Sequence, residues 1–251
     1  MTAAPWPYPL WIAHRGAGRL APENTLAAFR VGAAYGFRAF ECDVKLSRDG
    51  VPFLLHDATL ERTTNGVGAA ADLEWSVLAR LDAGGWHGRV TAGEPPPSLE
   101  AVARWCRANG HALNIEIKPS PGRETETGDA VARTSKDLWR GTSASPLLSS
   151  FNPASLAAAQ AAAPDLPRAL LLDRLGDGWL DDALRLGCIA VVVHHALVDA
   201  GVLAALRARA LRALAYTVND PAEVLRLTRL GIDGMITDAV DRFSPALSGL
   251  G

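Results

Sequence analysis

Residues suited to an acid–base or metal site are concentrated in one short stretch, residues 40–57, with the sequence FECDVKLSRDGVPFLLHD. Side chains on one face of a β-strand repeat every second position, so Glu41 and Asp43 are expected to point to the same side. The Asp-Gly dipeptide that follows is typical of a tight turn. A hairpin about that turn would return His56 to roughly the level of Asp43. The stretch therefore predicts two carboxylates and one imidazole at a single place.

A third carboxylate, that of Glu116, is expected to join them from an adjacent strand at residues 112–118. Three negative charges cannot share a buried pocket without a cation or raised pKa values. Ligation by oxygen atoms alone suits Mg²⁺ or Ca²⁺ better than zinc, and the sequence does not distinguish these two ions. The alternative is an ion network in which Arg15 and Lys118 neutralise the carboxylates.

Two histidines, His14 and His56, are expected to flank the acidic residues. Imidazole has an ordinary pKa of about 6.5 and is the natural proton-transfer group near neutral pH. Together with a cation, Arg15 and Lys118, the two histidines suit an anionic substrate whose negative charge grows during the reaction. Phosphoryl transfer is the class of reaction that needs such a set.

Other reactive side chains have simpler interpretations. His87 and His111 are expected to be superficial or structural. His194 and His195 end a predicted strand, and the sequence leaves open whether they line a substrate pocket. Cys42 alternates with the acidic residues along its strand, so it should point away from them as an inert core thiol.

The rest of the chain predicts the scaffold that must position these residues. Apolar strand-like runs alternate with helix-like segments, which indicates βα units and a parallel sheet. Without the returning hairpin strand, eight parallel strands are predicted, at residues 10–13, 39–46, 112–118, 146–152, 169–173, 188–195, 212–220 and 233–238. Eight such units in 251 residues are typical of a TIM (β/α)8 barrel, whose active site lies at the C-terminal ends of the strands. An open doubly wound sheet is the alternative.

One domain is expected over residues 1–251, with residues 58–97 inserted in it as a small cap. This segment follows the hairpin and contains Thr-Thr-Asn-Gly, Gly-Gly and Pro-Pro-Pro runs. A helix-like pattern at residues 73–81 indicates an ordered piece within it. The charged segment at residues 123–126 is expected to be a solvated connection.

The overall composition excludes several classes of protein. The chain is 49% hydrophobic and 21% charged with a formal net charge of -2, so it has no basic field for nucleic acid. No stretch approaches the roughly 18 apolar residues of a membrane span, and the N-terminus does not resemble a signal peptide. Three cysteines make no disulfide framework and suit a reducing compartment. We expect a cytoplasmic protein with a small-molecule substrate and no stable membrane insertion. A homodimer is offered only as the commonest oligomeric state.

In their order along the chain, several motifs resemble those of the glycerophosphodiester phosphodiesterase family, within the PLC-like phosphodiesterase superfamily. The matching pieces cover nearly the whole chain and are HRG (14–16), PENT (22–25), FECDV (40–44), LLHD (54–57), LERTTNG (60–66), NIEIK (114–118), TVN (217–219) and GIDGMITD (231–238). The resemblance implies a TIM barrel with a small inserted cap after the hairpin of the second strand.

The resemblance also implies roles for individual residues. A divalent cation, Mg²⁺ or Ca²⁺, would be held by Glu41, Asp43 and Glu116. The general acid and base would be His14 and His56. The residues in contact with the substrate would be Arg15, Lys118 and Asn219.

The implied reaction is hydrolysis of a deacylated phospholipid, such as glycerophosphocholine, to sn-glycerol 3-phosphate and an alcohol. The sequence leaves open the preferred alcohol and which histidine is the base. It also leaves open whether water attacks directly or the 2-hydroxyl of the substrate attacks first to form a cyclic phosphate.

Two other functions remain as alternatives. A lysophospholipase D would need an apolar groove near the cap, and its lining would be Trp75, Leu78, Leu81 and Trp86. Packing within the cap is the simpler interpretation of these four residues. A binding protein for glycerophosphodiesters that has lost catalysis is the other alternative, although the chain retains all three acidic residues and both histidines.

Overall fold

The structure is a computed structural model that describes residues 6–142, 144–243 and 245. The two ends of the predicted domain, residues 1–5 and 246–251, lie outside the described residues. None of the helices within the described ranges is long and apolar enough to cross a membrane.

Eight parallel strands close into a barrel, as the sequence predicts. Around the ring the order is β1-β9-β8-β7-β6-β5-β4-β2, and pairing of β1 with β2 completes it. Strand β3 pairs antiparallel with β2 outside the ring. The strands are β1 (Trp11–Ala13), β2 (Ala39–Leu46), β3 (Pro52–Leu54), β4 (Ala112–Ile117), β5 (Leu147–Ser150), β6 (Arg168–Leu172), β7 (Ala190–His194), β8 (Arg212–Tyr216) and β9 (Gly234–Thr237).

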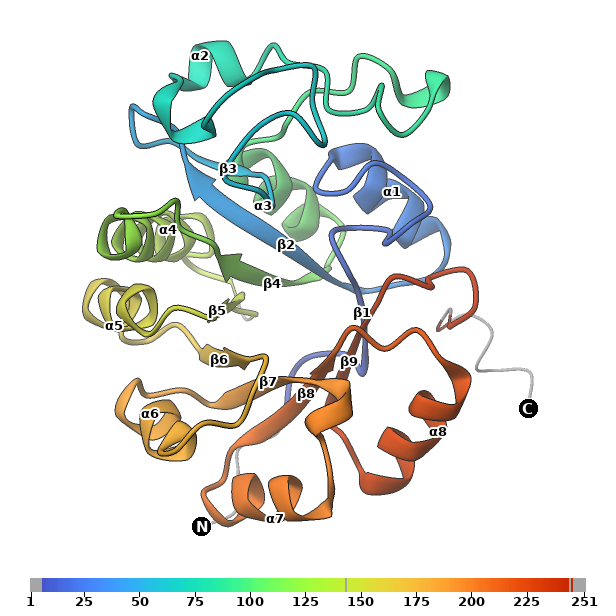
Figure 1. The fold of residues 1–251 in the computed structure, drawn as a ribbon, viewed down its shortest axis with the longest axis vertical. Coiled ribbons are helices and arrows are strands. Elements are labelled where there is room, and N and C mark those ends of the chain that lie inside the picture. Colours follow the sequence, from blue (N-terminus) through green and yellow to red (C-terminus); the bar gives the residue numbers. More distant parts are fainter. Residues whose placement is uncertain (1–5, 143, 244, 246–251) are drawn as a thin grey trace.

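Helices alternate with these strands and surround the barrel, which makes the fold a TIM barrel (Figure 1). The α-helices are α1 (Leu26–Ala34), α2 (Trp75–Leu78), α3 (Leu99–Ala108), α4 (Glu124–Leu138), α5 (Pro153–Ala162), α6 (Trp179–Arg185), α7 (Ala200–Ala208) and α8 (Pro221–Leu230). Short 3₁₀ turns are η1 (Ala70–Asp72), η2 (Arg89–Thr91) and η3 (His195–Leu197).

Strand β2 has two faces with different chemistry, and all eight of its residues are buried. Phe40, Cys42 and Val44 belong to the apolar core that the strands share with the covering helices. Since side chains alternate along a strand, Glu41 and Asp43 point the other way, into the barrel. The predicted strand boundaries and the predicted inward direction of the acidic residues are both confirmed.

The interior of the barrel is apolar below the acidic residues. A cluster of inward-facing side chains fills it and includes Ile12, Leu171, Val192, Leu214 and Ile236. A packed interior is the usual state of a TIM barrel, which is a core and not a pore. The acidic residues therefore lie above an apolar layer of side chains, at one end of the barrel.

The segment at residues 58–97 forms the small cap, which lies at the top of Figure 1 beyond β3. Its ordered elements are short: the helix-like pattern at residues 73–81 corresponds to the single turn of α2. Leu78 and Leu60 are fully buried with Phe53, and Trp75 and Leu81 pack on this cluster.

The charged segment at residues 123–126 is not the solvated connection that the sequence predicts. Helix α4 begins at Glu124, and both Glu124 and Glu126 lie in its first turn. Acidic side chains are stabilised there by the positive end of the helix dipole. The guanidinium of Arg123 pairs with Glu126 and donates to the Ser47 carbonyl oxygen at 2.8 Å, which attaches the start of α4 to the end of β2.

Candidate active site

The turn that follows β1 places two of the predicted residues, His14 and Arg15. Arg15 has a positive φ of 50°, and its backbone N–H donates to Glu41 Oε2 at 3.0 Å. Gly16 follows with φ 98°, and a Cβ at this position would lie 2.8 Å from the Cβ of Ala28. The His-Arg-Gly sequence is thus a turn that only glycine can complete, and it points both side chains over the acidic residues.

A second turn, before α1, orients Asp43. The side chain of Asn24 donates to Asp43 Oδ2 at 2.8 Å and accepts from the Asp43 backbone N–H at 3.1 Å. Thr25 caps α1 by accepting the N–H of Ala28. The PENT motif therefore serves both to start a helix and to fix one carboxylate.

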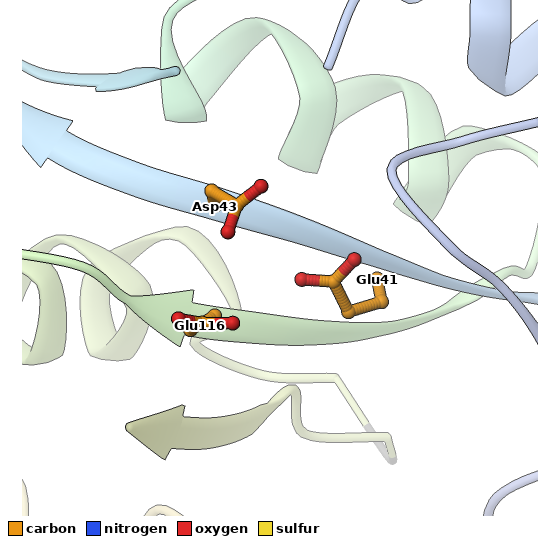
Figure 2. A group of neighbouring side chains, drawn as sticks. All are labelled: Glu41, Asp43 and Glu116. Atoms are coloured by element: carbon orange, nitrogen blue, oxygen red, sulfur yellow. The ribbon is translucent and has the colours of Figure 1, made fainter. Parts of the chain in front are cut away.

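The three acidic residues converge across the β2–β4 pair, and Figure 2 shows their carboxylates facing one another. Asp43 lies opposite Glu116 in the strand register. One oxygen from each of Glu41, Asp43 and Glu116 lies within 4.8 Å of the other two, and the three residues are 3%, 1% and 8% exposed. This spacing would let the three oxygens surround one cation.

Burial makes the negative charge of these carboxylates costly. Burial and the neighbouring Asp43 raise the pKa of Glu41 to about 8. The same two causes raise the pKa of Glu116. Burial acts in the same direction on Asp43, but Arg15 and Lys118 outweigh it and hold the pKa of this carboxyl well below its usual range.

The ion network considered as an alternative to a metal is also present. Arg15 Nε lies 3.2 Å from Asp43 Oδ2, and Lys118 Nζ lies 2.8 Å from Glu116 Oε1 and 3.3 Å from Asp43 Oδ1. Two basic side chains nevertheless face three carboxylates. Glu41 Oε1 is buried without a hydrogen-bond partner among the described residues. A hard divalent cation fits this donor set, because it would supply the missing charge and a partner for the free oxygen.

Each predicted histidine is held by an aspartate. His14 Nδ1 lies 2.6 Å from Asp238 Oδ1, and His56 Nδ1 lies 2.7 Å from Asp57 Oδ1. An ionised carboxylate can only accept a hydrogen bond, so Nδ1 carries the proton in both rings. The second nitrogen, Nε2, is then the one available for proton transfer, and in His14 it lies 3.8 Å from Glu41 Oε2.

The two histidines differ in their electrostatic surroundings. Burial lowers the pKa of His14, but the hydrogen bond to Asp238 and the charge of Glu41 outweigh it, so the net pKa is raised. For His56 the burial effect prevails and the pKa is lowered.

Asp57 is itself supported by a charged bridge. Arg62 donates to both carboxylate oxygens of Asp57 and, with two nitrogens at 2.8 Å, to Glu23. The hydrogen bonds from Arg62 and His56 lower the pKa of Asp57 to about 2. Because Glu23 also accepts from Arg15 at 2.9 Å, a chain of ion pairs connects the two histidine sides of the site.

These side chains surround a cavity of about 180 Å³, which we call the catalytic cavity. Its walls are His14, Arg15, Glu41, His56, Asn114, Glu116, Lys118, Phe151, Leu171, Tyr216, Thr217 and Ile236. Asn114 is 4% exposed, and neither its amide nitrogen nor its amide oxygen has a hydrogen-bond partner within the described residues. The cavity wall thus presents free polar atoms to a ligand.

Some predicted residues lie elsewhere. Asn219 is not in the cavity wall: it lies behind Asp238, donating to Asp238 Oδ2 at 3.0 Å and accepting the Asp238 backbone N–H at 2.8 Å. His194 and His195 are also outside the cavity walls, and His195 pairs with Glu223.

The three remaining predictions of structural roles agree with the structure. His87 is exposed and bonds to the Arg19 carbonyl oxygen. His111 packs against Phe40. Cys42 is fully buried.

Sequence reasoning missed the residues that hold the histidines and Asp43. In the sequence, Asp238, Asp57 and Asn24 stand out only as parts of motifs. The one local signal was the His-Asp dipeptide at 56–57, because neighbouring residues at a strand end can bond to each other. Lys45 was also overlooked: it is 2% exposed and donates to the Lys118 carbonyl oxygen at 3.0 Å.

The chain matches the model of the Glycerophosphoryl diester phosphodiesterase family over residues 14–242. A glycerophosphodiester phosphodiesterase of Caldanaerobacter subterraneus is 32% identical over 91% of this chain and 93% of its own length. One from Bacillus subtilis is 28% identical over 96% of this chain and 87% of its own length.

Solved structures give the same result. A phosphodiesterase of Oleispira antarctica, in complex with the product sn-glycerol-3-phosphate, superposes with a TM-score of 0.90 at 33% identity. The match covers 96% of this chain and 97% of that protein. A glycerophosphodiester phosphodiesterase of Agrobacterium tumefaciens superposes with a TM-score of 0.78 at 27% identity, over 97% of this chain and 99% of the other.

Proposed function

Since the chain belongs to the glycerophosphoryl diester phosphodiesterase family, we propose that it hydrolyses glycerophosphodiesters to sn-glycerol 3-phosphate and an alcohol with two histidines and a divalent cation. The chain is an enzyme, a glycerophosphodiester phosphodiesterase. The observation that carries the mechanism is the convergence, around one cavity, of two aspartate-held imidazoles, two basic side chains and three buried carboxylates, of which only Asp43 is not part of the cavity wall. The Oleispira antarctica relative with bound product supports sn-glycerol 3-phosphate as the product here.

The residues that would hold the cation are Glu41, Asp43 and Glu116. The raised pKa values of Glu41 and Glu116 and the unpartnered Glu41 Oε1 support this assignment. When bound, a divalent cation supplies positive charge against the negative charge that develops on the phosphoryl oxygens. Oxygen ligands suit both Mg²⁺ and Ca²⁺.

The protein's own groups bind the phosphate and move protons. Arg15 and Lys118 border the cavity and would attract and orient the anionic phosphate. One of the two imidazoles, His14 or His56, accepts at Nε2 the proton of the attacking oxygen. The other donates a proton from Nε2 to the alcohol oxygen as its bond to phosphorus breaks. The two aspartates keep both Nε2 atoms directed into the cavity.

Asn114 is the candidate partner for a glycerol hydroxyl. Its amide group lies in the cavity wall, is almost fully buried and lacks a partner among the described residues. A substrate hydroxyl can both donate to and accept from an amide. The contact would satisfy groups that are otherwise costly to leave unpaired.

The cellular setting is part of the same proposal. Cys42, Cys106 and Cys188 are free and buried, which supports a reducing compartment such as the cytoplasm. The homodimer and the single domain over the full chain stay predictions.

The test is release of sn-glycerol 3-phosphate from glycerophosphocholine and glycerophosphoinositol, measured before and after EDTA and after Mg²⁺ or Ca²⁺ is restored. We expect release that EDTA stops and one of the ions restores, because the proposed reaction needs the positive charge of the ion against the phosphoryl oxygens. A second test is Glu41→Gln, which keeps the shape of the proposed ligand but removes its charge. At an ion concentration that saturates the wild-type enzyme, kcat/KM of this variant should be lower by about 100-fold.

Full activity in EDTA would contradict the cation, and no product from any diester would contradict the substrate class. Activity of Glu41→Gln equal to that of the wild type would exclude Glu41 as a ligand.

A further inference from the structure

A second cavity, of about 380 Å³, borders the catalytic cavity on the side of the cap. We call it the cap cavity. It shares His14 and Arg15 with the catalytic cavity, so the two cavities meet at the residues proposed to handle the phosphate. The cap contributes Trp86 and His87 to its wall, and the turn after β1 contributes Arg19.

We propose that the cap cavity receives the alcohol moiety of the diester and favours polyhydroxylated alcohols, such as glycerol and inositol, over quaternary ammonium alcohols such as choline. The inference rests on the phosphodiesterase function proposed above. A phosphodiester has two organic arms on one phosphorus. With the phosphate beside Arg15 and the glycerol arm in the catalytic cavity, the other arm has the cap cavity as its neighbouring space.

The indole of Trp86 forms a fixed platform in this cavity. Trp86 is 44% exposed, although its ring N–H donates to the Ala83 carbonyl oxygen at 2.8 Å. The ring is therefore anchored at its edge while apolar surface remains open. A flat indole face can pack against the C–H groups of a polyol ring or chain.

The backbone that carries Trp86 is closely packed. Asp82 Oδ1 accepts the backbone N–H groups of Gly84 and Gly85, both at 2.8 Å. A Cβ on Gly84 would lie only 1.8 Å from the Thr91 carbonyl oxygen, so only glycine fits there. His87 Nε2 donates to the Arg19 carbonyl oxygen at 3.2 Å, which joins this part of the cap to the turn after β1.

The charges around the cap cavity favour hydroxyl groups over a cationic alcohol. Both carboxylates in its wall are already paired: Glu23 with Arg15 and Arg62, and Asp238 with His14. By contrast, within the described ranges the guanidinium of Arg19 has no ion-pair partner. A quaternary ammonium gains a cation–π contact with Trp86, but it finds no free carboxylate in the wall and is repelled by Arg19. The five N–H donors of a guanidinium instead suit the adjacent hydroxyls of a polyol.

The experiment compares kcat/KM for glycerophosphoinositol, glycerophosphocholine and the methyl ester of sn-glycerol 3-phosphate, whose methyl group has no hydroxyl for Arg19 and little surface for Trp86. Wild-type enzyme, Trp86→Ala, Arg19→Gln and Arg19→Glu are assayed under identical conditions. Val90→Ala is the matched control, because Val90 lies in the same part of the cap, is fully exposed and is outside the cavity wall.

We expect Trp86→Ala and Arg19→Gln each to lower kcat/KM for glycerophosphoinositol about tenfold, the effect of losing one stacking or hydrogen-bonding contact. The methyl ester should change less than about twofold. Arg19→Glu should raise the ratio of kcat/KM for glycerophosphocholine to kcat/KM for glycerophosphoinositol by more than about tenfold, since it replaces a repulsive charge with an attractive one.

Two results would overturn the subsite while leaving the proposed function intact. One is an equal loss on all three substrates in both Trp86→Ala and Arg19→Gln. The other is a wild-type preference for the choline substrate that Arg19→Glu does not increase. If the wild type hydrolyses none of the three diesters, the proposed function fails and the subsite fails with it.

Discussion

At the scale of single residues, the site depends on partners that are distant in the sequence. His14 is held by Asp238, 224 residues away, and Asp43 is held by Asn24. His56, in contrast, is held by its own neighbour, Asp57. The two imidazoles therefore have the same hydrogen-bond arrangement. For His14 the aspartate is distant in the sequence, and for His56 it is the next residue.

Replacing each histidine separately should show which one is the general acid and which one is the general base. We expect His14→Ala and His56→Ala each to lower kcat by about 100- to 10,000-fold on a diester with a poor leaving group. On a nitrophenyl diester, whose leaving group needs no proton, only the variant that lacks the base should remain slow. The measurement is the pH–rate profile of both variants on both substrates. Unchanged activity of His56→Ala on every substrate would contradict the two-histidine mechanism.

Asp238→Asn tests whether the distant aspartate positions and charges His14. The Asp238 carboxylate raises the pKa of His14, so its removal should lower that pKa. The limb of the kcat/KM profile that reports His14 should then move to lower pH, and kcat should fall by about 10- to 100-fold with little change in KM. Asp173→Asn, at an exposed position after β6, is the control. A variant that loses activity without any shift of the pH profile would show a merely structural role.

The sequence predicts the residues that line the proposed site better than the residues that support them. Glu41, Asp43, Glu116, His14 and His56 could be found because they lie at alternating positions or strand ends. The Asp238–His14 contact could not be found, since no local pattern reports which strands become neighbours when a barrel closes. Asn219 shows the same limit: its place behind Asp238 depends on the pairing of β8 with β9.

At the scale of elements, the predicted strands were accurate where the apolar pattern alternates strictly. Residues 39–46 match β2 at both ends. The sequence failed at the start of α4, because a run of charged residues is equally compatible with a loop and with a helix terminus. The helix start is stabilised by a tertiary contact that no local pattern reports, the hydrogen bonds from Arg123 to the end of β2.

Helices α4 and α5 pack closely at Gly128. A Cβ at this position would lie 2.2 Å from the Ser155 carbonyl oxygen, so Gly128→Ala must push the two helices apart. Alanine by itself favours a helix by up to about 1 kcal/mol, but the clash should dominate and lower the free energy of unfolding by about 1–3 kcal/mol. Urea denaturation measures the change. Gly176→Ala is the control, since a Cβ there meets nothing within 4 Å, and equal stability of both variants would contradict the close packing.

At the scale of the whole molecule, the barrel keeps its polar and apolar parts separate. One large apolar core lies between β2, β4 and helices that include α1 and α3, and a second lies on the side of β7, β8 and α7. A third fills the barrel interior below the catalytic cavity. The reactive groups occupy only the open end, where they can meet solvent and substrate.

The three thiols report on the intactness of these cores. Burial raises the pKa of Cys106 and of Cys188 to about 12 and that of Cys42 well above its usual value. At pH 8 all three should remain protonated and shielded, and the thiolate is the reactive form. We expect no reaction of the native enzyme with Ellman's reagent over minutes and release of three equivalents in strong denaturant. Rapid reaction of even one native thiol would show that a core opens locally.

The pairing of β1 with β9 has a consequence for the order in which the enzyme is made. His14 and the acidic residues are synthesised early, whereas Asp238 follows the last strand of the barrel. Chains grow on the ribosome from the N-terminus, so while β9 is still in the exit tunnel, His14 has no aspartate and the ring of strands has no closing member. The nascent chain thus carries every proposed metal ligand and both histidines before it carries Asp238, so His14 gains its aspartate partner only after the last strand of the barrel has been made.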